Sequence, residues 1–276
     1  MTDGYGRARL PRAVVLTFDN LGEVSAIGRG EWSGRQPLGS DPSVTQALPW
    51  LLDALDRSGL TATFFVEADN CELNPLALAQ IVSRGHELGA HGWQHETWGE
   101  LASSPHRERE LLERITRTFA DAGFPVSGFR PPGGTLTPAT LELLDELGYM
   151  WCSPAAARPA KARPFCAGAV CVVPFIWELV DAFHLMERFA GLRYRHGGSA
   201  APAAADAVGR RFAHLLGGGG SGVQTVVMHP FLMLEPAWRK QVELLLERLG
   251  ELRRSEEAWV VAGGEFAAWW GLPVRE

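Results

Sequence analysis

The stretch "AVVLTFDN", residues 13–20, decides the expected fold. Residues 13–18 form an apolar run of strand length, and Asp19 and Asn20 follow it directly. A run that is apolar throughout, rather than at alternate positions, is typical of a strand buried on both faces in a parallel sheet. In such sheets the reactive groups gather at the carboxyl ends of the strands. The stretch therefore predicts a buried parallel strand that carries a carboxylate into a site.

The same pattern recurs along the chain. Further strand-like runs occupy residues 62–66, 86–91, 126–130, 149–153, 169–175, 225–229 and 258–263. Helical patterns lie between them, at residues 45–59, 74–85, 104–123, 137–148, 202–218 and 235–254. Strands that alternate with helices predict a parallel sheet with crossover helices, in a barrel or an open sheet. No phosphate-binding glycine motif opens the first helix, which disfavours a dinucleotide-binding open sheet.

The composition indicates one soluble domain of the α/β class that spans residues 1–276. The chain has 46% hydrophobic and 21% charged residues and a formal net charge of −6. Since no block of like charge stands out, we expect no nucleic-acid surface. No apolar run approaches the roughly 18 residues of a membrane span, and the first 20 residues lack the pattern of a secretion signal. We therefore expect a cytoplasmic protein that makes no membrane contact, and the sequence leaves a homo-oligomer open.

Polar residues of complementary chemistry follow several of the predicted strands. They are Asp19, Asn20 and Glu23 after the first run, His91 and His95 after the third, Arg130 after the fourth, and His229 after the seventh. Because the carboxyl ends of parallel strands meet at one rim, we expect these side chains to converge.

This set of side chains suits the hydrolysis of an amide. Two neutral imidazoles and one oxygen ligand leave coordination positions of a metal open for water, as in a hydrolytic metal site. A carboxylate beside that water can take its proton, and an imidazole on the other side can protonate the leaving nitrogen. Arg130 can hold a carboxylate through a forked hydrogen bond and keep it ionised.

Four short motifs resemble those of the polysaccharide deacetylase superfamily, metal-dependent carbohydrate esterases that remove N-acetyl groups from chitin-like sugars and peptidoglycan. They are "LTFDN" (16–20), "HGWQH" (91–95), "FRPPGG" (129–134) and "VVMHP" (226–230), in the family's order. The resemblance implies a distorted, TIM-like (β/α) barrel of about seven parallel strands in a single domain. It also implies roles: Asp19 as catalytic base, His91 and His95 as metal ligands, Arg130 as the residue that orients the base, and His229 as general acid.

Within the superfamily the sequence is most similar to an intracellular branch, with Helicobacter-type peptidoglycan deacetylase homologues and allantoinase-like hydrolases of cyclic ureides and imides. One position departs from the family pattern, because Asn20 stands where the family has an Asp that binds the metal. An amide oxygen adds no charge to a metal site. We therefore expect either a divalent metal, with zinc first and cobalt, nickel or iron as alternatives, held by His91, His95 and Asn20 or Glu23, or no metal at all.

Residues of the rim loops are candidates for substrate binding. Tryptophan and phenylalanine side chains there can form an aromatic wall. The resemblance also suggests Asp181 as the aspartate that tunes the acid histidine, and His184 follows it without an assigned role. The predicted substrate-binding residues are Trp93, Trp98, Pro132, Gly133, Trp177, Asp181 and Phe231.

Three functions follow from these observations. The first is a metal-dependent N-deacetylase or deacylase of an amino sugar or related small metabolite. The second is a hydrolase of cyclic amides, imides or ureides that works without a metal, which Asn20 favours. The third is a barrel that has lost catalysis and only binds a ligand. Asp19, Arg130 and His229 oppose the third, because a binding protein has no need of a matched acid and base.

Overall fold

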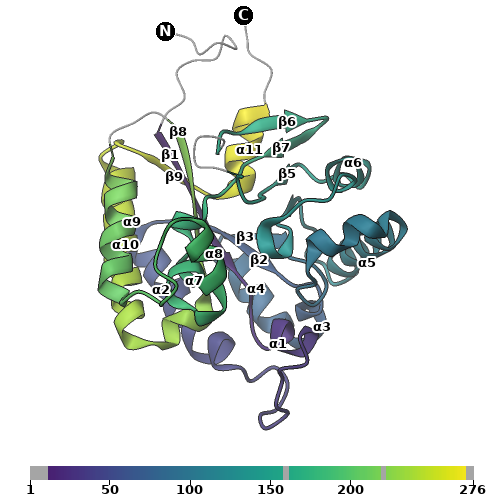
Figure 1. The fold of residues 1–276 in the computed structure, drawn as a ribbon, viewed down its shortest axis with the longest axis horizontal. Coiled ribbons are helices and arrows are strands. Elements are labelled where there is room, and N and C mark those ends of the chain that lie inside the picture. Colours follow the sequence, from purple (N-terminus) through teal and green to yellow (C-terminus); the bar gives the residue numbers. More distant parts are fainter. Residues whose placement is uncertain (1–11, 158–161, 219–221, 272–276) are drawn as a thin grey trace, which may run out of the picture.

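The computed structural model describes residues 12–157, 162–218 and 222–271, and the described strands form one curled sheet (Figure 1). Its order is β6-β7-β5-β4-β3-β2-β1-β8, with β9 also paired to β1. The strands are β1 (Arg12–Asp19), β2 (Thr63–Val66), β3 (Glu87–Ala90), β4 (Gly128–Phe129), β5 (Trp151–Cys152), β6 (Phe165–Ala167), β7 (Val170–Val172), β8 (Gly222–Met228) and β9 (Trp259–Val261).

Strand β1 lies at the centre of the sheet. One of its edges pairs in parallel with β8 from Arg12 to Phe18. Its other edge is shared, since β9 lies along Ala13–Val15 and β2 lies along Thr17–Asp19, both in parallel. The strand that the opening stretch predicted is therefore held by three neighbours, which fixes the position of the residues at its carboxyl end.

The eight predicted strands are confirmed, and all are paired in parallel. Within the described ranges the number of parallel strands is therefore eight, where the prediction was about seven. Strand β6, which pairs with β7 antiparallel across a two-residue turn, was not predicted. Its residues give no buried apolar run, and Phe165 is 49% exposed.

The barrel is not closed by regular strand pairing between β7 and β8. Instead, the chain after β7 reaches β8 through one parallel bridge, between Val180 and Val227. A hydrogen bond from the Thr225 hydroxyl to the Pro174 carbonyl, 3.0 Å long, also spans this gap. These contacts explain why the barrel that the motifs implied is distorted.

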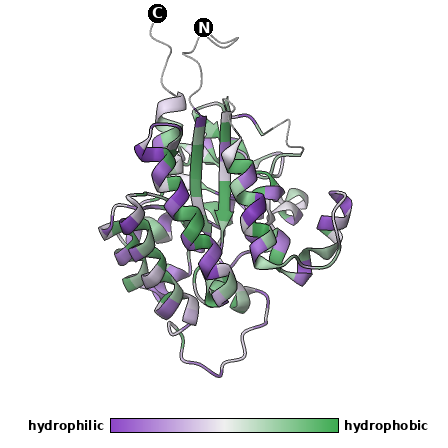
Figure 2. Ribbon diagram, turned by 90° about the vertical axis from the view of Figure 1, so that its left-hand side faces the viewer, coloured by the Kyte–Doolittle hydropathy of each residue, from purple (hydrophilic) through white to green (hydrophobic). Residues whose placement is uncertain are grey.

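Helices cover the outside of the sheet, and Figure 2 shows their hydrophilic residues mainly away from the strands. The six predicted helices are confirmed, although several begin or end a few residues away from the predicted limits. The described helices are α1 (Val24–Gly28), α2 (Leu48–Ser58), α3 (Asn70–Leu73), α4 (Pro75–Ser83), α5 (Pro105–Asp121), α6 (Thr140–Glu146), α7 (Asp181–Leu185), α8 (Ala190–Arg195), α9 (Ala205–Gly217), α10 (Pro236–Arg254) and α11 (Gly263–Gly271). No helix among the described residues is long and apolar enough to span a membrane, and the cytoplasmic location stays a prediction.

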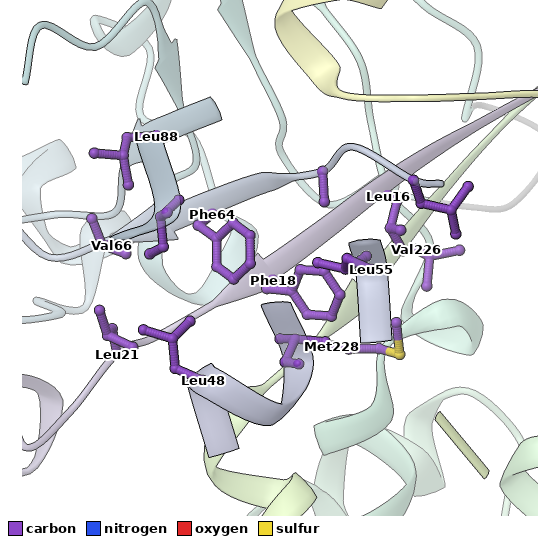
Figure 3. Close-up of a cluster of buried hydrophobic side chains, with 14 of the residues drawn as sticks. Leu16, Phe18, Leu21, Leu48, Leu55, Phe64, Val66, Leu88, Val226 and Met228 are labelled. Carbon is purple, nitrogen blue, oxygen red and sulfur yellow. The ribbon is translucent and has the colours of Figure 1, made fainter. Parts of the chain in front are cut away.

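Alternate residues of β1 serve two different environments, because successive side chains of a strand point to opposite faces. Leu16 and Phe18 belong to the large apolar cluster between the sheet and helices such as α2. Figure 3 shows Phe18 beside Phe64 of β2, and the two ring centroids are 5.0 Å apart. Each fully buried Leu or Phe side chain contributes about 1.5–3 kcal/mol to folding.

The other face of β1 lines the inside of the barrel. Ala13 and Val15 pack in a second buried cluster with Trp151 and with Phe266 of α11. The next two residues on this face are Thr17 and Asp19, both buried. The inside of the barrel therefore changes from apolar to polar toward the carboxyl end of β1, where the predicted site residues lie.

Candidate active site

Asp19 and Arg130 form a buried ion pair at the carboxyl ends of β1 and β4. The Arg130 Nη1 atom donates to Asp19 Oδ1 over 2.5 Å and to the Thr17 hydroxyl over 2.8 Å. Its Nη2 atom donates to the Ser153 hydroxyl, at 2.8 Å, just after β5. Three strands therefore fix the guanidinium, which in turn fixes the carboxylate.

The guanidinium of Arg130 is also held by aromatic rings. Its central carbon lies 4.3 Å from the centroid of the Phe65 ring and 5.2 Å from that of Phe175. Arg130 is 1% exposed. Burial lowers the pKa of Arg130, and the charge of Asp19 opposes that shift. A buried charge of this kind needs its partner, so the pair acts as one unit.

His91 follows β3 and points toward Asp19. Its Nδ1 atom lies 2.8 Å from the Arg130 carbonyl oxygen, so this nitrogen carries the hydrogen and donates it. Its Nε2 atom lies 3.9 Å from Asp19 Oδ2. The imidazole therefore turns an unprotonated nitrogen to the carboxylate oxygen that Arg130 does not bind.

His95 joins His91 through a tight turn. The two rings meet edge to face with centroids 4.9 Å apart, and His95 has a left-handed backbone with φ 68°. The Glu96 carboxylate stabilises the turn by accepting the backbone N–H groups of Trp93 and Gln94, each over 2.9 Å. Burial, as the largest cause, lowers the pKa of each histidine to about 3, so both rings are neutral.

His229 at the end of β8 is paired with Asp181 of α7. The His229 Nδ1 atom lies 2.6 Å from Asp181 Oδ1. Asp181 also accepts the backbone N–H of His229 at 2.9 Å and the indole N–H of Trp238 at 3.2 Å. Burial alone would lower the pKa of His229, but the charge and the hydrogen bond of Asp181 raise it above its usual value.

These side chains surround one cavity of about 70 Å³. Its wall combines charged and polar side chains with aromatic and aliphatic ones. The residues that line it are Asp19, Asn20, His91, His95, Arg130, Pro131, Gly133, Gly134, Phe175, Trp177, Val180, Phe189, Val227 and His229.

The side-chain amide of Asn20 donates a hydrogen bond to a buried carboxylate. Its Nδ2 atom donates to Glu67 Oε1 over 2.5 Å. Glu67 is fully buried, and burial, as the largest cause, raises its pKa to about 7. Asn20 itself is 8% exposed and lines the cavity.

The predicted metal ligands do not fit a tightly bound divalent ion. They offer two neutral imidazoles and one amide, and the described residues contain no group of three His, Cys, Asp or Glu side chains that could hold an ion. Glu23 does not supply the missing carboxylate, because it accepts the backbone N–H of Gly39 and does not line the cavity. A neutral amide adds no charge to offset that of the ion.

Several predicted site residues are brought together as expected. Asp19, Asn20, His91, His95 and Arg130 line the cavity, and so do Gly133, Trp177 and His229. The convergence predicted from the strand ends is therefore present in the structure.

Trp98 and Trp93 do not form the predicted aromatic wall. Trp98 is fully buried, and its indole N–H contacts Glu108 at 3.1 Å and Thr140 at 3.2 Å. Trp93 packs against the core, with the Arg114 guanidinium 3.4 Å above its ring. Both side chains are used for packing, since the loop after β3 turns them inward.

Four other predicted residues also lie behind the cavity wall. Pro132 is buried beside the lining residue Gly133, and the Phe231 ring lies 5.3 Å from that of His229 without lining the cavity. Asp181 is fully buried and supports His229 instead of lining the cavity. His184 lies 3.0 Å from the Glu178 carbonyl through Nε2 and is used in the packing of α7.

The sequence analysis missed residues that support or line the site: Thr17, Glu67, Ser153, Phe175, Phe189 and Trp238. Thr17 and Ser153 could have been found, because each lies on or directly after a predicted strand beside an assigned residue. Glu67 also directly follows the predicted strand 62–66. Nothing in the local pattern distinguishes Trp238 from other apolar residues of a helix.

Comparisons with known proteins identify relatives of this chain. The family model described as polysaccharide deacetylase matches residues 7–151. A peptidoglycan-N-acetylglucosamine deacetylase of Bacillus cereus is 32% identical over 111 residues, which cover 40% of this chain and 50% of that protein. The chain thus matches about half of the length of this curated relative.

Solved structures share the fold over nearly the whole chain. A putative polysaccharide deacetylase from Mycobacterium smegmatis has a TM-score of 0.76 at 21% identity, covering 98% of this chain and 94% of the other. An allantoinase has a TM-score of 0.71 at 17% identity, covering 97% and 95%. The predicted barrel fold is confirmed. Because the family model also covers more than half of the 276 residues, the chain belongs to the polysaccharide deacetylase family.

Proposed function

We propose that the protein hydrolyses a carbon–nitrogen amide bond of a small molecule, with Asp19 as general base and His229 as general acid. One observation carries this proposal. Asp19 and His229 line the same cavity, yet a guanidinium binds the first and a carboxylate binds the second. Titratable groups with opposite partners in one cavity are typical of an acid and a base with separate tasks.

Asp19 is suited to accept a proton from water. Arg130 binds only the Oδ1 atom of Asp19. The Oδ2 atom takes part in no described hydrogen bond and faces His91. The charged hydrogen bond from the guanidinium holds this carboxylate in one orientation. A water at Asp19 Oδ2 can give a proton to Asp19 while its oxygen attacks the amide carbonyl.

His229 is suited to give a proton to the leaving nitrogen. Its Nδ1 atom is occupied by Asp181, so Nε2 is the nitrogen available to the cavity. The raised pKa keeps the ring protonated to higher pH than an ordinary histidine. Donation from Nε2 would turn the amine into a good leaving group as the tetrahedral intermediate collapses. Asp181 then stabilises the charged ring without touching the substrate.

The cavity favours a small substrate. Its volume of about 70 Å³ lies below the usual range for small-molecule sites. We propose a linear N-acyl compound, an amino sugar or a related metabolite, with the acyl group against Trp177 and Phe189. The B. cereus relative is named as a deacetylase of an N-acetylated amino sugar, which supports this class of substrate.

A second candidate is the hydrolysis of a cyclic amide, imide or ureide. The neutral Asn20 beside Asp19 favours it, because the donor set lacks the carboxylate of a metal-binding triad. The chemistry assigned to Asp19 and His229 is the same for a cyclic amide. The two candidates differ only in whether the two products stay joined.

A panel of four probes tests both candidates. N-Acetylglucosamine and 4-nitroacetanilide represent linear amides, and hydantoin and dihydrouracil represent cyclic ones. We expect turnover within one of the two classes, and loss of that turnover in Asp19→Asn and His229→Ala. Binding of a probe without turnover of any of the four would support the hypothesis of a barrel that only binds.

A further inference from the structure

We infer that Glu67 is a positioning residue of this site. It holds the side-chain amide of Asn20 so that the carbonyl oxygen, Oδ1, faces the cavity beside Asp19. There Oδ1 accepts a hydrogen bond from the water that attacks the substrate. The part that concerns the water rests on the proposed function, whereas the orientation of Asn20 does not.

The Glu67 carboxylate is surrounded by N–H groups. It follows β2 directly, is fully buried, and accepts Asn20 Nδ2 at Oε1. At Oε2 it accepts the backbone N–H of Leu21 at 3.3 Å and the Asn70 amide at 3.1 Å. The Asn20 amide meets this carboxylate through its nitrogen, Nδ2, so its carbonyl oxygen, Oδ1, points the other way.

The backbone of Asn20 supports this placement. Its N–H donates to the Phe65 carbonyl at 3.1 Å, which completes the last pair of β1 with β2, Asp19 with Phe65. Its φ of 63° is left-handed, a conformation that asparagine tolerates better than most residues. The flanking Leu21 and Val66 lie in the apolar cluster of Figure 3. Since the residues around the Asn20–Glu67 pair are packed, the amide has little freedom to rotate.

This orientation leaves a defined acceptor in the cavity. Asp19 and Asn20 are consecutive and both line the cavity, and Nδ2 of Asn20 is occupied, so Oδ1 is its free polar atom. A water has two hydrogens. Asp19 takes one as a proton, while the neutral Oδ1 accepts the other as a hydrogen bond and does not compete for it. Glu67 itself lies behind Asn20 and does not line the cavity.

A double-mutant cycle measured by thermal unfolding tests the orientation. Asn20→Asp places a carboxylate against Glu67, so we expect a fall in Tm of at least about 4 °C at pH 8, on the scale of 2–4 °C per kcal/mol for a chain of this size. Adding Glu67→Gln should recover most of that loss, because the glutamine N–H group can donate to Asp at position 20. Two variants in direct contact are expected to be non-additive in this way.

Glu108→Gln provides the matched control. Glu108 is also fully buried and accepts hydrogen bonds from Trp98, Thr137 and Thr140, but it has no contact with Asn20. Combined with Asn20→Asp, it should lower Tm additively. If Glu67→Gln behaves in the same additive way, Glu67 does not hold Asn20 and the inference is overturned.

The kinetics of the single variants test the catalytic part. With a probe that the wild type turns over, Glu67→Gln should lower kcat by about tenfold, with KM nearly unchanged. This is less than the roughly 10² to 10⁴ of a proton-transfer group, because Glu67 acts only through Asn20. Glu108→Gln should change neither value. An unchanged kcat in Glu67→Gln would overturn the positioning role. If no probe is turned over by the wild type, the proposed function fails, while the cycle in Tm still decides the orientation of Asn20.

Discussion

The Oδ1 atom of Asp181 and the Nδ1 atom of His229 are 2.6 Å apart, although 48 positions separate the two residues in the chain. Asp181 is fully buried, so its charge is not screened by water. Its effect on His229 outweighs burial, which alone would lower the pKa of the ring. The pair gives the site an acid that stays protonated to higher pH than an ordinary histidine.

Replacing Asp181 should move the pH dependence of the reaction. The folded pKa of His229 is raised, so activity that needs the protonated ring is present at low pH and is lost as pH rises through that pKa. Asp181→Asn removes the charge, and we expect the alkaline limb of kcat/KM to move to lower pH by about one unit or more, since one unit corresponds to 1.36 kcal/mol. A pH profile of both proteins measures this. An alkaline limb at the same pH in both would show that His229 is not the acid.

Asp19→Asn and His229→Ala should each lower kcat by a hundredfold or more, within the roughly 10² to 10⁴ of a positioned acid or base. Their effects on stability should differ. Asp19→Asn leaves the buried Arg130 without its counter-charge, a loss of about 3–5 kcal/mol, whereas Asp181 keeps several N–H donors after loss of the His229 ring. Kinetics and thermal unfolding of both variants test this, and equal Tm values would contradict the assigned role of the ion pair.

Removal of metal should leave the reaction intact. The site offers two neutral imidazoles and an amide, and Asp19 and His229 carry the proposed proton transfers. Protein dialysed against a strong chelator should therefore keep its turnover, with elemental analysis to confirm that it is free of metal. Loss of turnover that added zinc restores would favour the metal-dependent deacetylase, with His91 and His95 as ligands.

Two tryptophans that look alike in the sequence should respond in opposite ways. Trp177 lines the cavity, so Trp177→Ala should raise KM for the preferred probe and change Tm little. Trp98 is fully buried, so Trp98→Ala should lower stability by about 3–5 kcal/mol and leave KM nearly unchanged. Michaelis constants and unfolding curves of the two variants are the measurement. If KM rises only in Trp98→Ala, Trp98 contacts the substrate after all.

The sequence predicted the polar residues of the rim well because the regular geometry of parallel strands determines where these residues lie. Asp19, Arg130 and His229 each follow an apolar run, and parallel strands end on one side of a sheet. Their convergence needed no knowledge of the loops. The alternation of strand and helix predicted the class of fold for the same reason.

The sequence predicted the cavity wall poorly because loops have no such regular geometry. Trp98 begins a short 3₁₀-helix, Trp98–Ser103, that packs inward onto Glu108. Phe189, which no pattern singled out, lies against Trp177 with ring centroids 5.7 Å apart. Burial of an aromatic ring in a loop depends on distant contacts, so residue type and spacing do not reveal it.

The gap between β7 and β8 gives the fold a natural place for change. The chain that spans it carries Trp177, Asp181 and Phe189, yet its described residues add no strand to the sheet and join β8 by a single bridge. Asp19 ends β1, whereas His91 and Arg130 directly follow β3 and β4, and β2 links β1 to β3 in the regularly paired part of the sheet. The sequence and length of this segment can therefore change while Asp19 keeps its place. Such changes would alter the shape of the cavity and the acidity of His229 together. New specificities could arise here by insertion or exchange without rebuilding the barrel.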